Sequence, residues 1–269
     1  MPALSLAPRN EASPRFTLPP ALALAITGKV AGVALWLLHA RALGAALFFG
    51  PDPLVLHAVF VPSAQGLGRV FTRFATERRE IWLTIDDGPD PEDTPRILDL
   101  LDRHRARATF FLVGTCAARW PALVAEILRR GHEVAHHTHT HPAASWWCAG
   151  PARLAAELDR ATLALRHGGA NPRRFRPPVG IKHLLLGAAL QRRGLDCIGW
   201  SIRSGDCLAR DADAVVRSVV RRIHPGAIVL LHEGPSVPAP LRVTTIARLL
   251  AALAERDYAC IIPDRNRLR

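Results

Sequence analysis

The sequence predicts an α/β protein: a distorted (β/α) barrel of about seven parallel strands, preceded by an apolar, membrane-embedded helical segment. Two features predict the barrel. After Glu77, short apolar runs alternate with amphipathic segments, and seven such units fit into about 190 residues. This alternation is typical of a parallel sheet covered by helices, and many short units suit a barrel better than an open sheet. A third feature, the apolar run over 16–62, predicts the preceding segment.

The apolar segment 16–62 is expected to form two membrane helices, at about 18–40 and 42–62. A spanning helix needs roughly 20 apolar residues. Lys29 and Arg41 interrupt the run, and prolines shorten and kink the second helix. Two other interpretations stay open. One is a signal peptide with the core VAGVALWLL, although it would be unusually long and apolar sequence continues beyond it. The other is a buried hairpin in a soluble protein.

The remaining chain divides by composition. Residues 1–15 carry proline, serine and charge and are expected to be disordered. We expect a linker over 63–79, the barrel domain over 80–263 and a basic tail over 264–269.

Strands and helices alternate through the expected barrel. The expected strands are IWLTID (81–86), ATFFLVG (108–114), EVAHH (133–137), RRFRP (173–177), DCIGWSI (196–202), AIVLLH (227–232) and ACIIP (259–263). The expected helices lie near 94–105, 117–130, 151–167, 181–193, 212–223 and 241–256. Thr94 followed by Pro95 is a typical helix start, and Val215, Val216 and Val219 give one helix an apolar stripe that faces a core.

The net charge of +12 comes almost entirely from arginine. Genomic base composition explains such a bias, and so does attraction to an anionic membrane or a phosphorylated substrate. The basic residues are scattered without interleaved aromatics, so we expect no nucleic-acid partner. The five cysteines are widely spaced and form no CxxC pair, which indicates neither a disulfide framework nor a cysteine-based zinc site.

Polar clusters stand at the ends of the expected strands, where barrels of this kind carry their chemistry. Asp86 and Asp87 close the first strand ahead of a Gly-Pro turn, a pattern that also fits a simple acidic turn. The third strand closes with four histidines in six positions, and His137 and His141 are spaced so that both rings can face one point. Zinc favours such nitrogen ligands with a carboxylate and an open position for water. A surface tract that sequesters metal is the alternative.

Three further strand ends carry charged or titratable side chains. Arg176 precedes two prolines and can hold a carboxylate through its planar fork, although a rigid turn explains the same residues. Asp206 follows the fifth strand, and His232 ends the buried run AIVLL. A histidine in that position is a candidate general acid or base.

Five motifs in this order resemble the polysaccharide deacetylase family, also called the NodB homology domain or carbohydrate esterase family 4. They are TIDDGPD (84–90), HHTHTHP (136–142), FRPPVG (175–180), WSIRSGD (200–206) and IVLLHEG (228–234). The resemblance covers about residues 80–263 and implies a distorted barrel of parallel strands.

The resemblance also implies roles for individual residues. It gives the metal ligands as Asp87, His137 and His141, the catalytic base as Asp86 with its charge partner Arg176, and the catalytic acid as His232, tuned by Asp206. Leu230 would line an acyl pocket, and the backbone N–H of Val179 would face the oxyanion. His139 would point away from the metal, and the role of His136 stays open.

The sequence departs from the family at two positions. Cys207 and Val179 stand where the family often has tryptophan and tyrosine, and both aromatics shape sugar binding. We therefore expect a metal-dependent hydrolase that removes an N-acyl group, foremost N-acetyl, from an amino sugar in a glycan or a lipid-linked sugar. The cofactor is a divalent metal, with zinc favoured over cobalt, nickel or manganese. The alternatives are a deacetylase of exported or cell-wall polysaccharide and, in another class, a non-catalytic glycan- or metal-binding barrel.

The distribution of arginines predicts the side of the membrane. Arg9 and Arg15 precede the two helices, four arginines follow within 69–79, and only Arg41 lies between the helices. A hairpin would then place both flanks and the barrel in the cytoplasm, whereas a single span would leave the barrel on the exported side.

Overall fold

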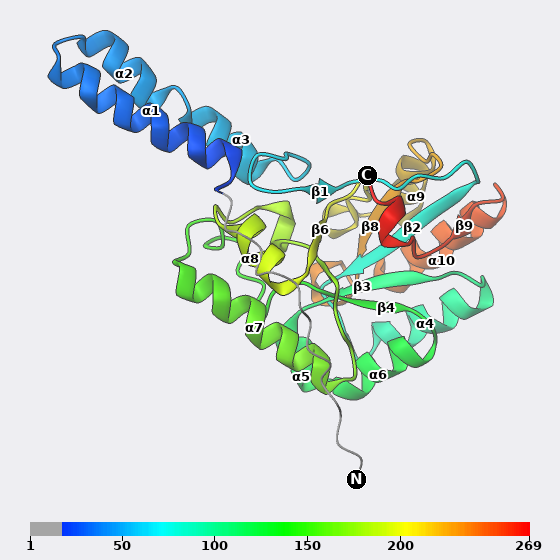
Figure 1. Ribbon diagram of the computed structural model, residues 1–269. Coiled ribbons are helices and arrows are strands. Elements are labelled where there is room, and N and C mark those ends of the chain that lie inside the picture. The colour runs from blue at the N-terminus through cyan, green and yellow to red at the C-terminus, as the bar shows by residue number, and fades with distance from the viewer. Residues whose placement is uncertain (1–17) are drawn as a thin grey trace.

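The computed structural model describes residues 18–269, so the expected disorder of residues 1–15 lies outside the described part. A helical hairpin at the start projects away from a curled sheet that is covered by helices (Figure 1). The nine strands of the described residues are β1 (Val70–Phe71), β2 (Glu80–Asp86), β3 (Ala108–Leu112), β4 (Glu133–His136), β5 (Arg174–Phe175), β6 (Asp196–Ile198), β7 (Ile202–Arg203), β8 (Ile228–His232) and β9 (Ala259–Cys260).

All strand pairs of this sheet are parallel, in the order β1-β6-β5-β4-β3-β2-β8-β7, and β9 also pairs with β2. The expected strand 196–202 is interrupted over 199–201, so that it supplies β6 to one end of the sheet and β7 to the other. The two ends therefore meet at this stretch, and the predicted distorted barrel of parallel strands is confirmed. The expected linker 63–79 contributes β1, a strand that the sequence analysis did not find.

Seven helices accompany the strands in the described residues after the hairpin. They are α4 (Asp93–Arg103), α5 (Gly114–Arg119), α6 (Pro121–Arg129), α7 (Pro151–His167), α8 (Leu186–Arg193), α9 (Ala212–Val220) and α10 (Arg242–Ala254). The expected single helix over 117–130 is two helices, because the backbone leaves the helical region at Trp120 and Pro121 starts a new helix. The expected helix over 181–193 begins only at Leu186.

The prediction that Thr94 caps α4 is wrong. The helix begins at Asp93, and the side chain of Asp90 accepts bonds from the N–H groups of Glu92 and Asp93 at 2.9 Å each. The hydroxyl of Thr94 instead accepts from the N–H of Asp90 at 2.8 Å and donates to Glu233 at 2.6 Å.

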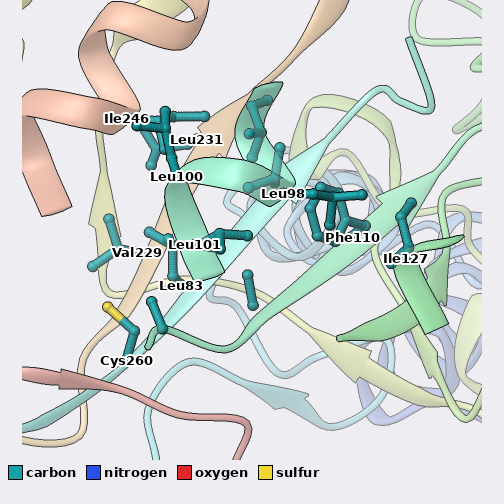
Figure 2. Packing of buried hydrophobic residues seen from close by; sticks show 14 of the residues in the cluster. Leu83, Leu98, Leu100, Leu101, Phe110, Ile127, Val229, Leu231, Ile246 and Cys260 are labelled. Atoms are coloured by element: carbon teal, nitrogen blue, oxygen red, sulfur yellow. The ribbon is translucent and has the colours of Figure 1, made fainter. Parts of the chain in front are cut away.

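Alternation along the strands separates the core from the site. Leu83, Val229 and Leu231 pack outward with Leu101 of α4 and Ile246 of α10 in the main core (Figure 2). The residues between them on β2 and β8 point into the barrel. These inward positions include Thr84, Asp86, Leu230 and His232, so the ends of two neighbouring strands place polar groups inside the barrel mouth.

The hairpin consists of α1 (Pro20–Leu37), α2 (Arg41–Phe49) and α3 (Asp52–Phe60). The stretches Pro20–Leu37 and Arg41–Phe60 are long and apolar enough to cross a membrane, with mean hydropathies of 1.6 and 1.5. The second is broken near Pro51, in agreement with the expected kink. Gly32 and Gly44 allow α1 and α2 to touch, because a Cβ on either residue would lie under 3 Å from the backbone of the other.

The charge of Lys29, which interrupts the apolar run, is paired within the hairpin. Its ammonium donates to Asp52 at 2.8 Å and to the carbonyl of Phe48 at 3.1 Å. This pairing lowers the cost of placing a lysine in an apolar surrounding.

Candidate active site

The end of β2 and the residue after it carry the two adjacent carboxylates, and both approach Nε2 of His137. Asp86 ends the strand and is 2% exposed. Asp87 adopts a φ of 78°, and its N–H donates to the carbonyl of Phe111 at 3.2 Å. A positive φ is unfavourable for a residue with a Cβ. Thr138, His141 and Val179 adopt it as well, so backbone strain gathers at these loops, as it often does at functional sites.

Asp87, His137 and His141 form a group that can hold a metal ion. Oδ1 of Asp87 lies 3.5 Å from Nε2 of His137 and 3.5 Å from Nε2 of His141. Burial by itself would raise the pKa of Asp87, but the hydrogen bond to His137 and the nearby histidine charges hold it well below its usual range. Burial lowers the pKa of His141, so its ring stays neutral and able to donate a lone pair to a metal.

A neighbouring carbonyl fixes the orientation of the His137 ring. Nδ1 of His137 bonds to the carbonyl oxygen of Arg176 at 2.8 Å, which leaves Nε2 facing Asp87. A partner of this kind sets the tautomer and direction of a metal-binding imidazole. For His141 the hydroxyl of Thr138 holds the backbone, because it accepts from the backbone N–H at 3.1 Å.

The other two histidines of the cluster face elsewhere. His136 is fully buried, and its ring bonds to the carbonyl of Leu158 at 2.9 Å and accepts from the N–H of Thr138 at 3.1 Å. Burial lowers the pKa of His136 to about 4. The ring of His139 lies against Gly114. The structure therefore gives His136 a structural role and places the ring of His139 outside the metal-ligand group.

Asp86 is bound to a buried arginine inside the barrel. Nη1 of Arg176 donates to Oδ1 of Asp86 at 2.7 Å and to the hydroxyl of Thr84 at 2.9 Å. Its other nitrogens donate to the carbonyls of Ile198 and Gly199 at 3.2 and 2.9 Å. Oδ2 of Asp86 lies 3.7 Å from Nε2 of His137. One carboxylate oxygen is thus tied to the arginine, and the other faces the candidate metal position.

His232 lies opposite Asp86 in the pairing of β8 with β2. Its Nδ1 bonds to Oδ1 of Asp206 at 2.8 Å, and its N–H donates to Oδ2 at 2.8 Å. The hydroxyl of Ser204 donates to the same carboxylate at 2.8 Å. Burial alone would lower the pKa of His232, but the hydrogen bond to Asp206 outweighs it, and the pKa lies well above 6.5.

Two further residues are expected from the sequence to contact the substrate. Leu230 is 2% exposed on the inward face of β8. Val179 is 50% exposed and adopts a φ of 50°, which is a true outlier for a β-branched side chain.

Sequence reasoning missed two acidic residues behind the site. Glu157 of α7 accepts bonds from the N–H groups of His139 and Thr140 at 2.8 Å each, and so holds the loop that carries His141. Glu233 is fully buried beneath the Asp87–Gly88 turn, and a Cβ on Gly88 would collide with it. Burial raises the pKa of Glu233 to about 8. No spacing rule points to either contact, because each joins elements far apart in sequence.

A well-formed cavity of the described residues lies away from the site. That cavity, of about 530 Å³, is lined mainly by the start of α1, by β1 and by α8. Its lining contains none of the three metal-ligand residues and no member of the Asp86–Arg176 and Asp206–His232 pairs.

The fold and the site define a class: a parallel barrel hydrolase with two titratable groups beside a potential metal position. Residues 74–198 match the model of the Polysaccharide deacetylase family. A chitooligosaccharide deacetylase of Bradyrhizobium sp. (strain ANU 289) is 43% identical over 158 residues, 58% of this chain and 71% of the relative. The chain therefore belongs to the polysaccharide deacetylase family.

Two further similarities bear on function. A peptidoglycan-N-acetylglucosamine deacetylase of Bacillus cereus is 32% identical over 71% of this chain and 89% of its own length. A solved structure of a CE4 family pseudoenzyme, a mutant with restored enzymatic activity, superposes on this chain with a TM-score of 0.63. The two chains are 27% identical in sequence, and the match covers 70% of this chain and 67% of the other. Since this fold also occurs in a pseudoenzyme, activity has to be argued from the site residues.

Proposed function

We propose that this protein hydrolyses the N-acetyl group of an amino sugar in a glycan, with a divalent metal ion as cofactor. The observation that carries the proposal is the grouping of three side chains that can hold a metal, beside a carboxylate paired with a buried arginine and a histidine paired with a buried carboxylate. The two named relatives support an amino-sugar substrate. The catalytic domain spans residues 80–263, and β1, which comes from the stretch 63–79, pairs with β6 of its sheet.

The donor set of Asp87, His137 and His141 fits zinc. Donor atoms around a tetrahedral zinc ion lie roughly 3.4 Å apart, given bonds of about 2.0–2.1 Å, and the two distances from Asp87 Oδ1 are 3.5 Å. Two imidazoles and one carboxylate also leave a coordination position open. A metal ion held there polarises the amide carbonyl and lowers the pKa of water towards about 7.

Asp86 acts as the general base in this proposal. Its free oxygen, Oδ2, faces the candidate metal position, and Arg176 holds the other oxygen. The ion pair with Arg176 fixes the carboxylate in place and leaves Oδ2 without a partner from the arginine. Asp86 can therefore accept the proton from the water molecule that attacks the carbonyl carbon.

His232 acts as the general acid. The Asp206 carboxylate keeps it protonated and directs Nδ1 away from the site, so Nε2 carries the proton that is donated to the departing amine. Val179 contributes its backbone N–H to the carbonyl oxygen as negative charge develops there. Leu230 contributes an apolar wall for the acetyl methyl group.

The alternative of a non-catalytic barrel is disfavoured by the same residues. Both the acid and the base positions are filled, and each is held by a buried partner of opposite charge. A protein that only bound glycans would have no need for this pair.

Acetate release from an N-acetylated chito-oligosaccharide tests the proposed function. We expect release with purified protein, its loss after treatment with a chelator, and its recovery when zinc is added back. Activity that is indifferent to the chelator would exclude the metal, and the absence of acetate with metal bound would favour the binding barrel.

The pH profile tests the pairing of His232 with Asp206. The acid is active when protonated, so kcat/KM falls as pH rises through the raised pKa of His232. Asp206→Asn removes the charge that raises this pKa, and we expect the alkaline limb to move to lower pH by at least about 1 unit. Asp213→Asn, which removes a surface carboxylate paired with Arg248, should leave the profile unchanged. An alkaline limb that does not move in Asp206→Asn would show that another group sets it.

We also propose that the hairpin is embedded in a membrane with the catalytic domain on the cytoplasmic side. Many of its large apolar side chains are exposed, for example Val30, Trp36 and Leu56, which is costly in water. Both ends of the hairpin lie at the barrel, since the N–H of Ala21 donates to the carbonyl of Gly66 at 3.2 Å. The turn near Arg41 then reaches the opposite interface.

A reporter fused to Arg269 tests this topology. A reporter that is active only in the cytoplasm should give signal, since the arginines flanking the hairpin favour that side. Signal only from a reporter that requires export would reverse the orientation and favour a wall-polysaccharide substrate.

A further inference from the structure

The base of the hairpin is joined to the rim of the candidate active site by one buried lysine. The backbone N–H of Lys182 donates to the carbonyl of Val59 at 2.9 Å, and its ammonium donates to those of Val61 and Pro62 at 2.6 and 3.2 Å. Lys182 is 1% exposed. Because the last turn of α3 bonds directly to the segment after the FRPPVG motif, the hairpin is part of the rim.

The contact extends to the turn that carries Val179. Gly180 has a φ of 77°, and a Cβ there would lie 2.7 Å from both Pro62 and Trp200. Pro62 therefore packs against the residue that follows Val179, the proposed oxyanion donor. The hairpin base is thus in contact with the chain one residue away from Val179.

An apolar surface runs along this junction. Phe60, the last residue of α3, is 44% exposed, and its ring centroid lies 5.6 Å from that of Trp147. Trp147 belongs to the loop after His141, and the half-exposed Val179 precedes Gly180, the residue that Pro62 approaches. We name Phe60, Trp147 and Val179 the rim strip. Phe60 ends the hairpin, whereas Trp147 and Val179 belong to the loops that follow two strand ends of the candidate site.

The charges near the base suit an anionic lipid interface. Residues 61–73, which lead away from the hairpin, contain Arg69 and Arg73 and no acidic residue. Basic residues near such a surface are attracted to anionic headgroups. With the hairpin embedded as proposed, its bonds to Lys182 hold the segment after the FRPPVG motif close to the membrane surface.

We infer that the natural substrate is an N-acetylated amino sugar anchored to the membrane by a lipid chain, and that the rim strip binds its lipid-proximal part. This inference rests on the proposed function and narrows it to one substrate class. A lipid anchor confines the sugar to the surface that the mouth faces, which raises its effective concentration. Burial of the apolar surface of the lipid chain against the rim strip removes that surface from water and adds to binding.

The test compares two substrates that differ only in their anchor. The metal-loaded, full-length protein is placed in nanodiscs of phosphatidylcholine and phosphatidylglycerol. The same acetylated chito-oligosaccharide is supplied with a methyl or a hexadecyl group at its reducing end, and acetate release is measured. We expect kcat/KM to be at least about tenfold higher for the hexadecyl form.

Variants separate the rim strip from simple partitioning into the lipid. Phe60→Ser and Trp147→Ser should lower kcat/KM for the hexadecyl substrate by several-fold and leave the methyl substrate unchanged. Leu163→Ser removes a similarly exposed side chain on α7 and should alter neither substrate. Equal kcat/KM for both substrates, or a preference that persists in both rim variants, would overturn the inference while the proposed function stands. Hydrolysis of neither substrate would overturn the proposed function and this inference with it.

Discussion

Asp86→Asn is expected to keep the metal and to lower kcat by at least about 10²-fold, the usual effect of removing a general base. Asparagine keeps an oxygen that accepts from Arg176, but its amide has no basic lone pair to take a proton from water. Loss of the counter-charge to a fully buried arginine also costs stability, by about 3–5 kcal/mol for a broken buried pair. The three neutral acceptors that remain around Arg176 should keep the domain folded.

Turnover and bound metal should be measured together, on protein shown to be folded by circular dichroism. Retained metal reports that the ligand group is intact, so that lost turnover can be assigned to the base. Asp159→Asn, which breaks a surface pair with Arg193, serves as the matched control and should change neither quantity. Near-normal kcat in folded Asp86→Asn would refute the assigned role.

His137→Ala and His141→Ala are each expected to abolish activity by loss of the metal. Changes in groups that only orient a ligand already weaken metal binding by about 10–100-fold, so removal of a ligand should cost at least about 100-fold. His139→Ala is the matched control from the same cluster, and we expect it to retain metal and activity because its ring faces Gly114.

Metal content after dialysis and a zinc titration decide between the two interpretations of the cluster. Wild type and His139→Ala should hold about one equivalent, as expected for one zinc site. Equal metal loss in all three variants would show that the histidines act as an unspecific sequestering tract.

The architecture could be predicted from the sequence because it follows from periodic patterns. Each inner strand of a parallel sheet is buried on both faces and reads as an apolar run, and parallel strands place their carboxyl ends at one edge. The first strand is an example: its predicted bounds, 81–86, differ by one residue from β2, and both carboxylates at its end lie in the barrel mouth.

Errors arose where one residue or one distant contact overrides the local pattern. Trp120 leaves the helical region ahead of Pro121 and divides an expected helix. Thr94 has the composition of a cap, but its hydroxyl binds Glu233, 139 positions away. Capping propensity depends on the residue and its neighbours in sequence, so it carries no information about a hydrogen-bond partner that is distant in the chain.

The sequence by itself determined the barrel, its five motifs and the apolar segment that precedes it, because hydrophobic periodicity and motif order are local properties. Spacing and motif order also predicted His137 and His141 as the ligands. Only the tertiary structure shows what holds them near Asp87: the positive φ of single residues, the carbonyl of Arg176 that binds the His137 ring, and the Glu157 carboxylate that accepts from the backbone of the His139 loop. It also decided that the hairpin base forms part of the rim. That contact is made by Lys182 across more than 100 positions of chain, and no periodic pattern encodes a pairing at such a distance.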